Sequence, residues 1–454
     1  MAVDVVIVGA GIAGLATAYE LSRHAVSFTV LERAPRAGGV ILSEEIDGYT
    51  IDGGADSLLI QKRDGIALCE EIGLGDRLVS TKPPRVAFIQ RGGRLHPLPA
   101  ASVLGIPTRV GPFLRTSLFS SAGKVRMGAE LFVPPRRTED DESIGAFMTR
   151  RFGREATTYL AEPLLAGIHA GDVDRLSVQA LFPRLANAER THGSLLRAFR
   201  SNPAPGPAGV FRSLPGGLSE MVRALVTALG AANVRTGAAV SAITGHGPFV
   251  VRTGAGEAID ARAVVLASPA YITSALMRTR DPDLAQLAGG IAYVSAATVA
   301  LAFRRTAITH PLNGSGFVVP RVEASGILAG SWLSSKWPHR APDDRVLMRT
   351  FVGGARDPKA LERSDEELVS LSLAALQPLV GIRGEPSLAR VYRWERANAQ
   401  HEVGHLTRMA AIERALARHP GIFVTGSGFR GVGIPDCIAD GRATARQVAT
   451  WLKQ

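Results

Sequence analysis

The feature that most constrains this chain is a glycine-rich turn, Gly9–Gly14, with the pattern G-x-G-x-x-G. The apolar run Val5–Val8 before it predicts a strand, and Leu15–Leu21 after it predicts a helix. The first glycine allows the tight turn, the second lets a diphosphate approach the backbone, and the third lets the helix pack on the strand. The helix N-terminus then offers free N–H groups to the anion. The turn alone is a weak signal, but in this context it predicts a dinucleotide site.

A second predicted strand, Phe28–Leu31, ends at Glu32. This acid lies about 20 residues past the turn, where such folds bind a ribose hydroxyl. An acid in this place favours an unphosphorylated adenosine ribose. The sequence therefore predicts FAD or NAD rather than NADP.

Further glycine clusters favour FAD. Glu32 is followed by Gly38–Gly39 in an E-x5-G-G extension, which resembles that of a large flavoprotein superfamily including amine oxidases and phytoene desaturases. Gly53–Ser57 offers a second close backbone approach, with Asp56 able to bond. Gly431–Asp436 precedes a predicted helix through Ala449 and places another helix N-terminus where the flavin ring or ribityl chain could sit.

Length and composition bound the class of protein. The 454 residues suffice for two or three packed units. The longest apolar stretch, Gly290–Phe303, is too short for a membrane span and predicts a buried strand or a pair of strands. The chain opens as a strand at Val3, which leaves no room for a signal peptide, so we expect a cytoplasmic location. Cys69 and Cys437 have no metal or redox spacing, and we expect reduced core thiols.

The charge is uneven along the chain. Lys and Arg number 52 against 41 Asp and Glu, and from Arg77 to Ala129 there are nine basic residues and no acidic one. A solvated face accounts for most of them, while an anionic ligand or an anionic membrane surface is the sharper interpretation. No nucleic-acid-reading motif accompanies the charge, so we expect no nucleic acid partner.

One motif points to a different chemistry. His401–His405 matches H-E-x-x-H, a zinc-protease signature. Position 408 is Arg and position 411 is Ala, so a third ligand is missing, and Gly404 weakens the helix that would carry both histidines. We therefore predict no metal site here.

The remaining pattern outlines other elements. Asp141 or Ser143 is a candidate helix cap, and residues 201–209, SNPAPGPAG, form the best linker. Strands are predicted at 263–268 and 423–425, and helices at 361–380 and 405–419.

The chain resembles a narrower family, the oxygen-dependent porphyrinogen oxidases of heme synthesis, and it is most similar to the bacterial branch that makes coproporphyrin III. The likeness runs nearly end to end. The stretches that carry it are 105–108 (GIPT), 162–172 (EPLLAGIHAGD), 176–177 (LS), 182–183 (FP), 337–338 (WP), 351–354 (FVGG) and 431–436 (GVGIPD).

The resemblance implies an α/β fold with a Rossmann-like (GR2-type), discontinuous FAD-binding domain, an α+β substrate domain and a helical subdomain. The FAD-binding domain is expected at 1–80, 206–275 and 390–454. The substrate-binding domain is expected at 81–90 and 276–389, and the helical subdomain at 91–205.

The family's site residues carry over position by position. The implied FAD contacts are Gly9, Ala10, Gly11, Ile12, Ala13, Gly14, Glu32, Arg33, Gly38, Gly39, Val40, Gly54, Ala55, Asp56, Ser57, Val240, Trp394, Val432, Gly433 and Ile434. Some relatives have a basic residue at the position of Val40, so only a backbone contact is expected there. Val240 would present its backbone to the adenine. Val240 and Trp394 are equally compatible with plain core roles.

The implied substrate contacts are Lys62, Arg63, Arg85, Gly167, Val318, Leu328 and Phe351. The three cations are candidates for gripping propionates, because carboxylates call for charge-assisted donors. The apolar side chains would sandwich the macrocycle, although each would serve equally well in a core. The resemblance names no catalytic acid or base, and Asp56 is the nearest orienting group.

The implied reaction is the six-electron, O2-dependent oxidation of coproporphyrinogen III to coproporphyrin III, with release of hydrogen peroxide. Protoporphyrinogen IX is the alternative substrate. An FAD amine or carotenoid oxidase, and a binding protein on the same fold, stay open as other classes. Expected partners are the porphyrinogen, O2, a transient heme-pathway enzyme and a peripheral membrane surface.

Overall fold

The computed structural model describes residues 2–99, 102–103, 105–138, 140–200 and 209–454. Within these residues, the first sheet has seven strands in the order β12-β2-β1-β15-β14-β13, with β21 also pairing with β15. Strand β1 is parallel to β2 and β15, and β21 is parallel to β15, whereas β13 and β14 are antiparallel. The strand bounds are β1 (Ala2–Val8), β2 (Phe28–Leu31), β12 (Val234–Arg235), β13 (Val240–Thr244), β14 (Phe249–Thr253), β15 (Ala258–Leu266) and β21 (Ile422–Val424).

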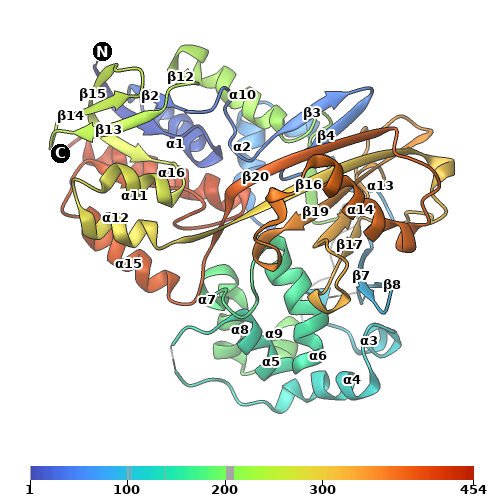
Figure 1. Cartoon of the computed structure of the whole chain (residues 1–454). Helices are drawn as coiled ribbons and strands as arrows, with labels where there is room; N and C mark the ends of the chain where they lie inside the picture. Colours follow the sequence, from blue (N-terminus) through green and yellow to red (C-terminus); the bar gives the residue numbers. More distant parts are fainter. Residues whose placement is uncertain (1, 100–101, 104, 139, 201–208) are drawn as a thin grey trace.

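Helices cover both faces of this sheet (Figure 1). Val5 and Ile7 of β1 pack into a core shared with α1 (Ile12–Arg23), α10 (Ser219–Leu229) and α16 (Ile434–Trp451). Val6 and Val8 point to the opposite core, which includes α12 (Pro282–Gly289) and α15 (His405–Leu416). Burial on both faces explains why β1 is a nearly continuous apolar run.

The predicted elements occur with small shifts at their ends. The strand predicted at 28–31 is confirmed, and those predicted at 263–268 and 423–425 are β15 and β21. The helix predicted at 361–380 is α14 (Asp365–Val380), which begins after a capping box formed by Ser364 and Glu367. The C-terminal helix is α16.

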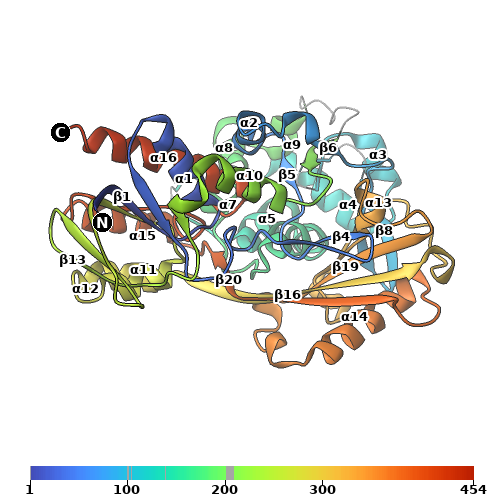
Figure 2. The ribbon, with the colours of Figure 1, turned by 90° about the horizontal axis from the view of Figure 1, so that it is seen from above.

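A second sheet has the order β20-β16-β19-β18-β17-β7-β8. The apolar stretch 290–303 forms one strand, β16, which pairs antiparallel with β20 over a long register. These two strands run from the first sheet across the second part of the molecule (Figure 2). Their bounds are β20 (Leu388–Gln400), β16 (Ala292–Arg304), β19 (Arg345–Gly353), β18 (Ala329–Ser331), β17 (Gly316–Val318), β7 (Ala87–Arg91) and β8 (Arg94–Pro97).

The second sheet also has a core on each face. Helix α14 packs against one face, and the hairpin of β3 (Ser43–Ile46) and β4 (Tyr49–Asp52) packs against the other. This hairpin lies between the glycine clusters 38–39 and 53–57, where no strand was predicted. Its turn residues Asp47 and Gly48 have φ values of +49° and +78°. Asp-Gly between apolar residues is a recognised hairpin signal, so the hairpin was visible in the sequence.

A helical unit lies below the second sheet in Figure 1. Its core joins residues such as Phe147, Leu160 and Leu185. Of the two candidate caps, Ser143 begins a helix, because its hydroxyl accepts from the Ala146 N–H. The bounds are α3 (Val110–Arg115), α4 (Ser121–Gly128), α5 (Ile144–Phe152), α6 (Arg154–Ala156), the π-helix η3 (Thr157–Ala166), η4 (Gly167–His169), α7 (Val178–Leu181), α8 (Pro183–His192) and α9 (Leu195–Phe199).

The remaining strands and α-helices of the described residues are short. They are β5 (Leu58–Leu59), α2 (Arg63–Glu71), β6 (Val79–Ser80), β9 (Ser102–Val103), β10 (Ile106–Pro107), β11 (Phe211–Ser213), α11 (Ala270–Met277) and α13 (Leu333–Lys336). Most of the predicted linker, 201–208, lies outside the described residues. None of the helices in the described ranges has the length and apolar character needed to cross a bilayer.

Candidate functional site

The turn after β1 has the geometry of a phosphate cradle. Gly9 has φ +110°, and its N–H donates to the Leu31 carbonyl at 2.8 Å. A Cβ at Gly14 would collide with the Gly9 carbonyl oxygen, whereas a Cβ at Gly11 would meet nothing within 4 Å. Gly11 caps α1 without a side-chain hydrogen bond, and the first turn of this helix has no acidic residue. An open backbone face at a helix N-terminus fits the diphosphate of a dinucleotide.

Glu32 stands beside this turn. Its carboxylate accepts from the backbone N–H groups of Ala10 and Ala34, each at 2.8 Å. A carboxylate has about four acceptor positions, so these two bonds orient Glu32 and leave positions for ribose hydroxyls. Arg33 is exposed, and so is the neighbouring Val40.

The glycine pair runs alongside the turn. The Gly38 N–H donates to the Ala10 carbonyl at 2.8 Å, and a Cβ at Gly39 would lie 3.4 Å from the Gly11 Cα. Arg36 braces this loop by donating to the carbonyls of Gly39 and Ile41, at 2.6 and 3.0 Å. The two glycine motifs therefore form one continuous backbone surface.

The loop Gly53–Ser57 approaches the same region from the second sheet. A Cβ at Gly54 would collide with the Val40 carbonyl oxygen. Trp394 Nε1 donates to the Gly53 carbonyl at 2.9 Å, and Arg349 donates to the Gly54 carbonyl at 2.7 Å. Trp394 thus holds the loop through its indole N–H, in addition to its packing role.

Asp56 is engaged by protein cations. Its carboxylate pairs with Lys336 at 2.9 Å and with Arg349 at 3.4 Å, and it accepts from Ser57 Oγ at 2.9 Å. These positive charges hold the pKa of Asp56 well below its usual range despite its burial. Any cofactor contact by Asp56 therefore falls to its backbone, because its carboxylate is taken up in this network.

The C-terminal turn joins the N-terminal one. A Cβ at Gly441 of α16 would collide with the Ala13 carbonyl oxygen, and Thr17 Oγ1 donates to the Gly441 carbonyl at 3.1 Å. The first half of α1 therefore packs closely against the middle of α16. Gly433 caps α16 without a side-chain hydrogen bond, so the backbone at Val432–Ile434 is available to a ligand. Val240, at the start of β13, is partly buried.

The predicted propionate-binding cations have different surroundings. Lys62 Nζ pairs with Asp436 Oδ2 at 2.5 Å, which links the start of α2 to the first turn of α16. Arg63 is exposed at the N-terminus of α2. Arg85 Nε donates to Thr81 Oγ1 at 3.0 Å. The structure therefore places Lys62 at the C-terminal glycine turn and ties Arg85 to its own loop.

The three apolar substrate candidates are brought together by strand register. Val318 pairs with Ala329, which pairs with Phe351, and the Leu328 N–H donates to the Phe351 carbonyl at 2.7 Å. The Arg349 guanidinium lies 4.7 Å from the Phe351 ring centroid. Leu328 is buried, whereas Val318 and Phe351 are partly exposed. Gly167 opens η4, directly after the π-helix.

His169 was not singled out from the sequence, although it lies in the stretch 162–172. Its backbone carbonyl accepts from Gln400 Nε2 at 3.0 Å. Burial and the positive charge of Lys62 lower the pKa of His169 to about 4, partly offset by Asp436. A neutral imidazole thus stands near the Lys62–Asp436 pair. The presence of a histidine in the stretch 162–172 was the sequence signal that could have singled out this residue.

The two histidines of the H-E-x-x-H segment bond to backbone carbonyl groups. His401 precedes α15 and His405 begins it, so the two rings do not project from one helix. His401 Nε2 lies 2.9 Å from the Ser427 carbonyl oxygen, and His405 Nε2 lies 2.8 Å from that of Phe429. Because a carbonyl oxygen only accepts, each Nε2 carries a proton and has no lone pair for a metal.

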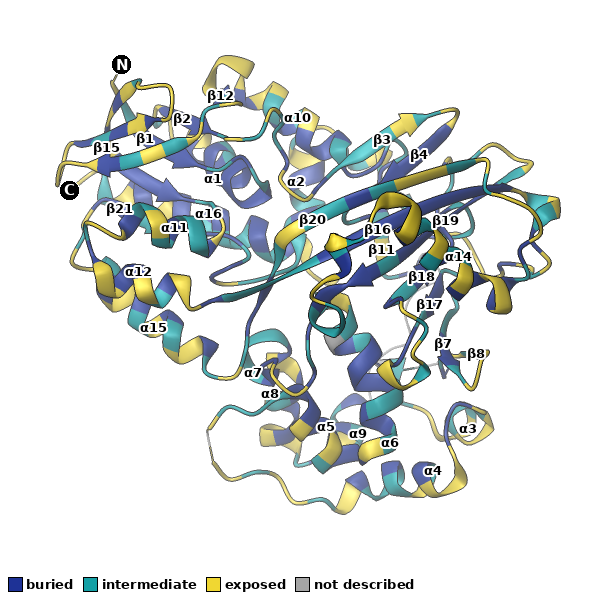
Figure 3. Cartoon of the chain, viewed as in Figure 1, coloured by how far each residue is buried: buried dark blue, intermediate teal, exposed yellow. Residues whose placement is uncertain are grey.

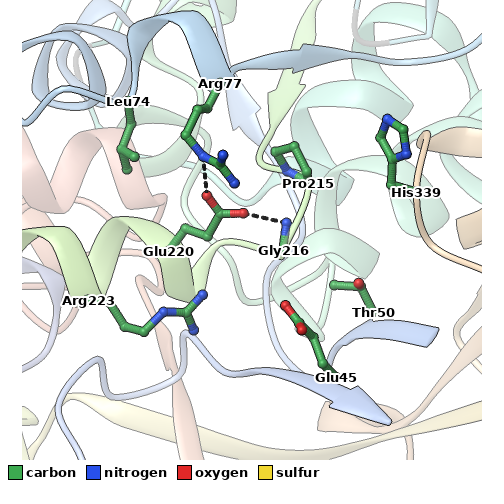
Figure 4. A pocket seen from close by; sticks show the side chains of 9 residues that line it. All are labelled: Glu45, Thr50, Leu74, Arg77, Pro215, Gly216, Glu220, Arg223 and His339. Atoms are coloured by element: carbon green, nitrogen blue, oxygen red, sulfur yellow. Dashed lines mark hydrogen bonds and ion pairs between the residues drawn. The ribbon is translucent and has the colours of Figure 1, made fainter. Parts of the chain in front are cut away.

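A polar cavity of about 510 Å³ lies apart from these residues (Figure 4). Figure 4 shows Glu220 bonded to Arg77 and to the backbone of Gly216. None of the sequence-predicted site residues lines this cavity. Its lining residues are Glu45, Thr50, Leu74, Arg77, Pro215, Gly216, Glu220, Arg223 and His339.

Comparison with known proteins covers nearly the whole chain. The family model for flavin containing amine oxidoreductases matches residues 12–449. A protein of Bacillus subtilis (strain 168) named coproporphyrinogen III oxidase is 35% identical over 464 residues, covering 99% of this chain and 98% of the relative. Its namesake from Staphylococcus aureus is 33% identical over 467 residues, covering 99% of each. A crystal structure from Exiguobacterium sp. 255-15, provisionally assigned as a protoporphyrinogen oxidase, matches with a TM-score of 0.89 at 33% identity over 99% of both chains.

Proposed function

This chain belongs to the flavin containing amine oxidoreductase family and uses FAD, and on that premise we propose that it oxidises coproporphyrinogen III to coproporphyrin III in heme biosynthesis. The reaction removes six hydrogens from the macrocycle in three two-electron steps. With O2 as the electron acceptor, three molecules of O2 are reduced to three molecules of hydrogen peroxide. FAD, when bound, supplies the two-electron chemistry and passes the electrons to O2.

One observation carries the proposal. The similarity to bacterial proteins named coproporphyrinogen III oxidase is continuous over nearly the full length of both chains. It therefore includes the cofactor turns at both ends and the middle of the chain. The level of identity along the whole chain, rather than the fold alone, supports this assignment.

In this proposal, the protein binds and orients the cofactor mainly through its backbone. The turn Gly9–Gly14 and the N-terminus of α1 hold the diphosphate, and Glu32 orients the ribose. The backbone at Gly38–Gly39, Gly54 and Val432–Ile434 borders the rest of FAD. Trp394 acts by fixing the carbonyl of Gly53.

The substrate would lie between the second sheet and the helical unit. Val318, Leu328 and Phe351 supply an apolar wall, and Gly167 faces it from η4. Supporting this placement, Arg356 pairs with Glu162 of the π-helix, and the Arg321 N–H donates to Glu162 at 2.9 Å. These bonds dock the π-helix against the residues that follow β17 and β19. We assign no proton transfer to a side chain.

Lys62, Arg63 and Arg85 are the proposed propionate-binding cations. Lys62 is paired with Asp436, so a propionate must share or displace that partner. The four propionates of coproporphyrinogen, against two in protoporphyrinogen, favour the former as substrate of a basic site.

The decisive experiment compares the two porphyrinogens with purified, FAD-loaded protein. Porphyrin fluorescence is followed under air, together with peroxide formation. We expect faster turnover of coproporphyrinogen III and one peroxide for each two electrons. Faster turnover of protoporphyrinogen IX would overturn the substrate assignment, and turnover of putrescine without porphyrinogen oxidation would favour an amine oxidase.

We also propose that helices α3 and α4 contact an anionic membrane surface. Val110 and Leu114 of α3, Val125 of α4 and Phe132, which ends the 3-10 helix after α4, have exposed fractions of 72%, 59%, 74% and 84%. Exposed residues recur along both helices in Figure 3. Arg109 and Arg115 are exposed on the same segment, which lies in the acid-free stretch. Exposed apolar side chains beside cations are typical of interfacial binding.

Vesicle co-sedimentation tests the membrane contact. We expect binding to vesicles containing phosphatidylglycerol, weaker binding to pure phosphatidylcholine, and loss of binding in the double variant Val125→Ser, Phe132→Ser. Leu406→Ser, which alters an exposed apolar residue on α15, is the matched control. Equal binding by the double variant and the wild type would refute the contact. A cytoplasmic location and a heme-pathway enzyme partner stay predictions.

The division into domains is likewise a proposal. The two cores of the first sheet draw on residues from the N-terminal part, the middle and the C-terminal part, for example Leu68, Leu225 and Cys437. Leu284 and Ala285 of α12 also pack there. We therefore propose that the middle segment of the FAD-binding domain extends through α12 to residue 289, beyond the expected limit at 275.

A further inference from the structure

The segment Gln400–His405 connects β20 to α15 and contains two buried imidazoles. His401 and His405 are 2% and 4% exposed. Their rings stack with centroids 3.8 Å apart and an angle of 10° between planes. Burial lowers the pKa of His401 to about 3, with a further contribution from His405, and burial also lowers the pKa of His405. Two neutral rings can stack closely, whereas two imidazolium ions would repel each other.

One edge of this pair faces the loop before α16. His401 Nε2 donates to the Ser427 carbonyl at 2.9 Å, and His405 Nε2 donates to the Phe429 carbonyl at 2.8 Å. Phe429 is buried and Ser427 is partly buried. Buried carbonyl groups need donors, and the two imidazoles supply them at alternate residues of the loop.

The backbone of the same segment is bonded to the helical unit. The Ser177 N–H donates to the His401 carbonyl at 2.9 Å. Asp141 accepts from the Gly404 N–H at 3.1 Å and from Ser177 Oγ at 2.8 Å. Gln400 Nε2 donates to the His169 carbonyl at 3.0 Å. The segment therefore lies between the helical unit and the C-terminal glycine turn, and it bonds to both.

We propose that the stacked His401–His405 pair positions the loop 425–433 so that the backbone at Val432–Ile434 is presented to FAD. The pair acts through the Ser427 and Phe429 carbonyls and touches no reacting atom, so both histidines are positioning residues. This inference rests on the proposed cofactor contacts of Val432, Gly433 and Ile434. It assigns a role to the H-E-x-x-H motif that needs no metal.

The physical expectation is a loop whose shape depends on two N–H donors. Without them, two inward-facing carbonyls lose their partners, and the loop gains alternative conformations. FAD must then order the loop on binding, and its apparent affinity falls by the fraction of loops that are competent. Leaving buried acceptors unpaired destabilises the competent loop conformation, so we expect FAD affinity to fall about tenfold.

The test uses the double variant His401→Phe, His405→Phe, which keeps two stacked, buried rings and removes both N–H donors. His401→Gln, His405→Gln is the rescue variant, because a glutamine amide can donate from a position similar to that of Nε2. His419→Phe is the matched control, because His419 is also bonded through Nε2, at 2.7 Å, to Asp281. The single variants His401→Phe and His405→Phe replace the double variant if it does not fold.

Two quantities are measured for each apoprotein: its Tm, and its Kd for FAD from the quenching of flavin fluorescence. We expect about a tenfold rise in Kd for the Phe variants, recovery to within about threefold of wild type for the Gln variant, and a lower Tm with unchanged Kd for His419→Phe. Wild-type affinity in the Phe variants, or no recovery with Gln, would overturn the proposal. Because the readout is FAD binding rather than turnover, such a result leaves the proposed oxidation of coproporphyrinogen untouched.

Discussion

The two glycine-rich turns at the ends of the chain are built in different ways. The turn Gly9–Gly14 is held mainly by backbone bonds, including those to Leu31 of β2 and to Gly38, and Glu32 is the side chain that accepts from its backbone at Ala10. The loop 425–433 is held by side chains. Asp440 accepts from Thr425 Oγ1 at 2.6 Å and from the Gly426 N–H at 2.9 Å, and the stacked histidines bond two of its carbonyls. The first turn is thus held mainly by backbone bonds, whereas the second depends on side chains from the segments that flank it.

The largest effect is expected from a substitution that disrupts the turn Gly9–Gly14. Gly14→Ala places a Cβ against the Gly9 carbonyl oxygen, where the backbone must shift. We expect destabilisation of the apoprotein by about 1–3 kcal/mol and at least a hundredfold loss of FAD affinity, measured by Tm and flavin fluorescence. Gly11→Ala is the matched control, because its Cβ enters open space and should weaken FAD binding while leaving the apoprotein Tm unchanged. Normal FAD binding by Gly14→Ala would show that FAD binding does not depend on the close packing of Gly14 against Gly9.

The next largest effect is expected from acid, which should destabilise the loop 425–433 more than the turn Gly9–Gly14. The pKa of His401 is lowered to about 3 from 6.5, so its contribution to stability is complete above the unfolded pKa and is lost as pH falls toward 3. The facing charged or titratable groups are His405, His169, Arg408 and Asp141. We expect unfolding free energy and FAD retention to fall below about pH 6.5, by up to about 1.4 kcal/mol per pH unit for each buried histidine.

The variant His401→Phe, His405→Phe sharpens this test. Its stability should fall less steeply with acid than that of the wild type, because His169 would then be the remaining histidine of the group. Chemical unfolding at pH 7, 6 and 5 measures the slope. Equal slopes in the two proteins would show that the loop 425–433 is not the acid-sensitive part.

A smaller effect is expected at the other anchor of the second turn. Asp440→Asn keeps an amide oxygen for Thr425 and Gly426 but loses the charge that also pairs with Arg430 at 3.3 Å. Hydrogen bonds to charged groups contribute about 1.5–3 kcal/mol and neutral ones about 1, so we expect a loss of about 1 kcal/mol in the free energy of unfolding. Urea unfolding of the apoprotein measures it, and no change would indicate that the histidines alone hold the loop.

The smallest effect on the apoprotein is expected at Glu32. Glu32→Gln keeps one acceptor oxygen for two backbone donors, Ala10 and Ala34, and the site is only partly buried. We expect a loss of about 0.5–1 kcal/mol in apoprotein stability, because the remaining turn is held by backbone bonds, together with weaker FAD binding. Urea unfolding of the apoprotein measures the stability, and flavin fluorescence measures the FAD affinity. A loss larger than that of Asp440→Asn would reverse the comparison between the turns.

Local patterns predicted the elements well. The strand 28–31, the helix after Gly14 and the strand that became β15 follow from apolar periodicity and glycine spacing. Two residues were predicted as candidate caps of α5. Ser143 caps the helix, whereas the Asp141 carboxylate accepts hydrogen bonds from Ser177 and Gly404. The choice between the two caps depended on where the partner segments lie, which the local sequence does not contain.

Contacts over long separations could not be predicted from spacing. Asp56 is paired with Lys336 and Arg349, almost 300 residues later, so a carboxylate that looked available is engaged. Likewise, the pairing of Lys62 with Asp436 depends on how α2 packs against α16. Strand register links Val318 through Ala329 to Phe351, and the Leu328 N–H bonds to the Phe351 carbonyl, an arrangement that spacing alone could not predict.

By itself, the sequence determined the glycine-rich turn, the acid at the end of the second strand and the two-sided burial of the central strands. These depend on backbone conformation and on the period of apolar residues, which neighbouring residues specify. Tertiary structure decided the shape of the second turn, the engagement of Asp56 and the role of His401 and His405. Their donors and acceptors lie on different segments of the chain, 24 and 26 residues apart for the two histidines and 280 for Asp56 and Lys336, so their bonds exist only once those segments have packed together.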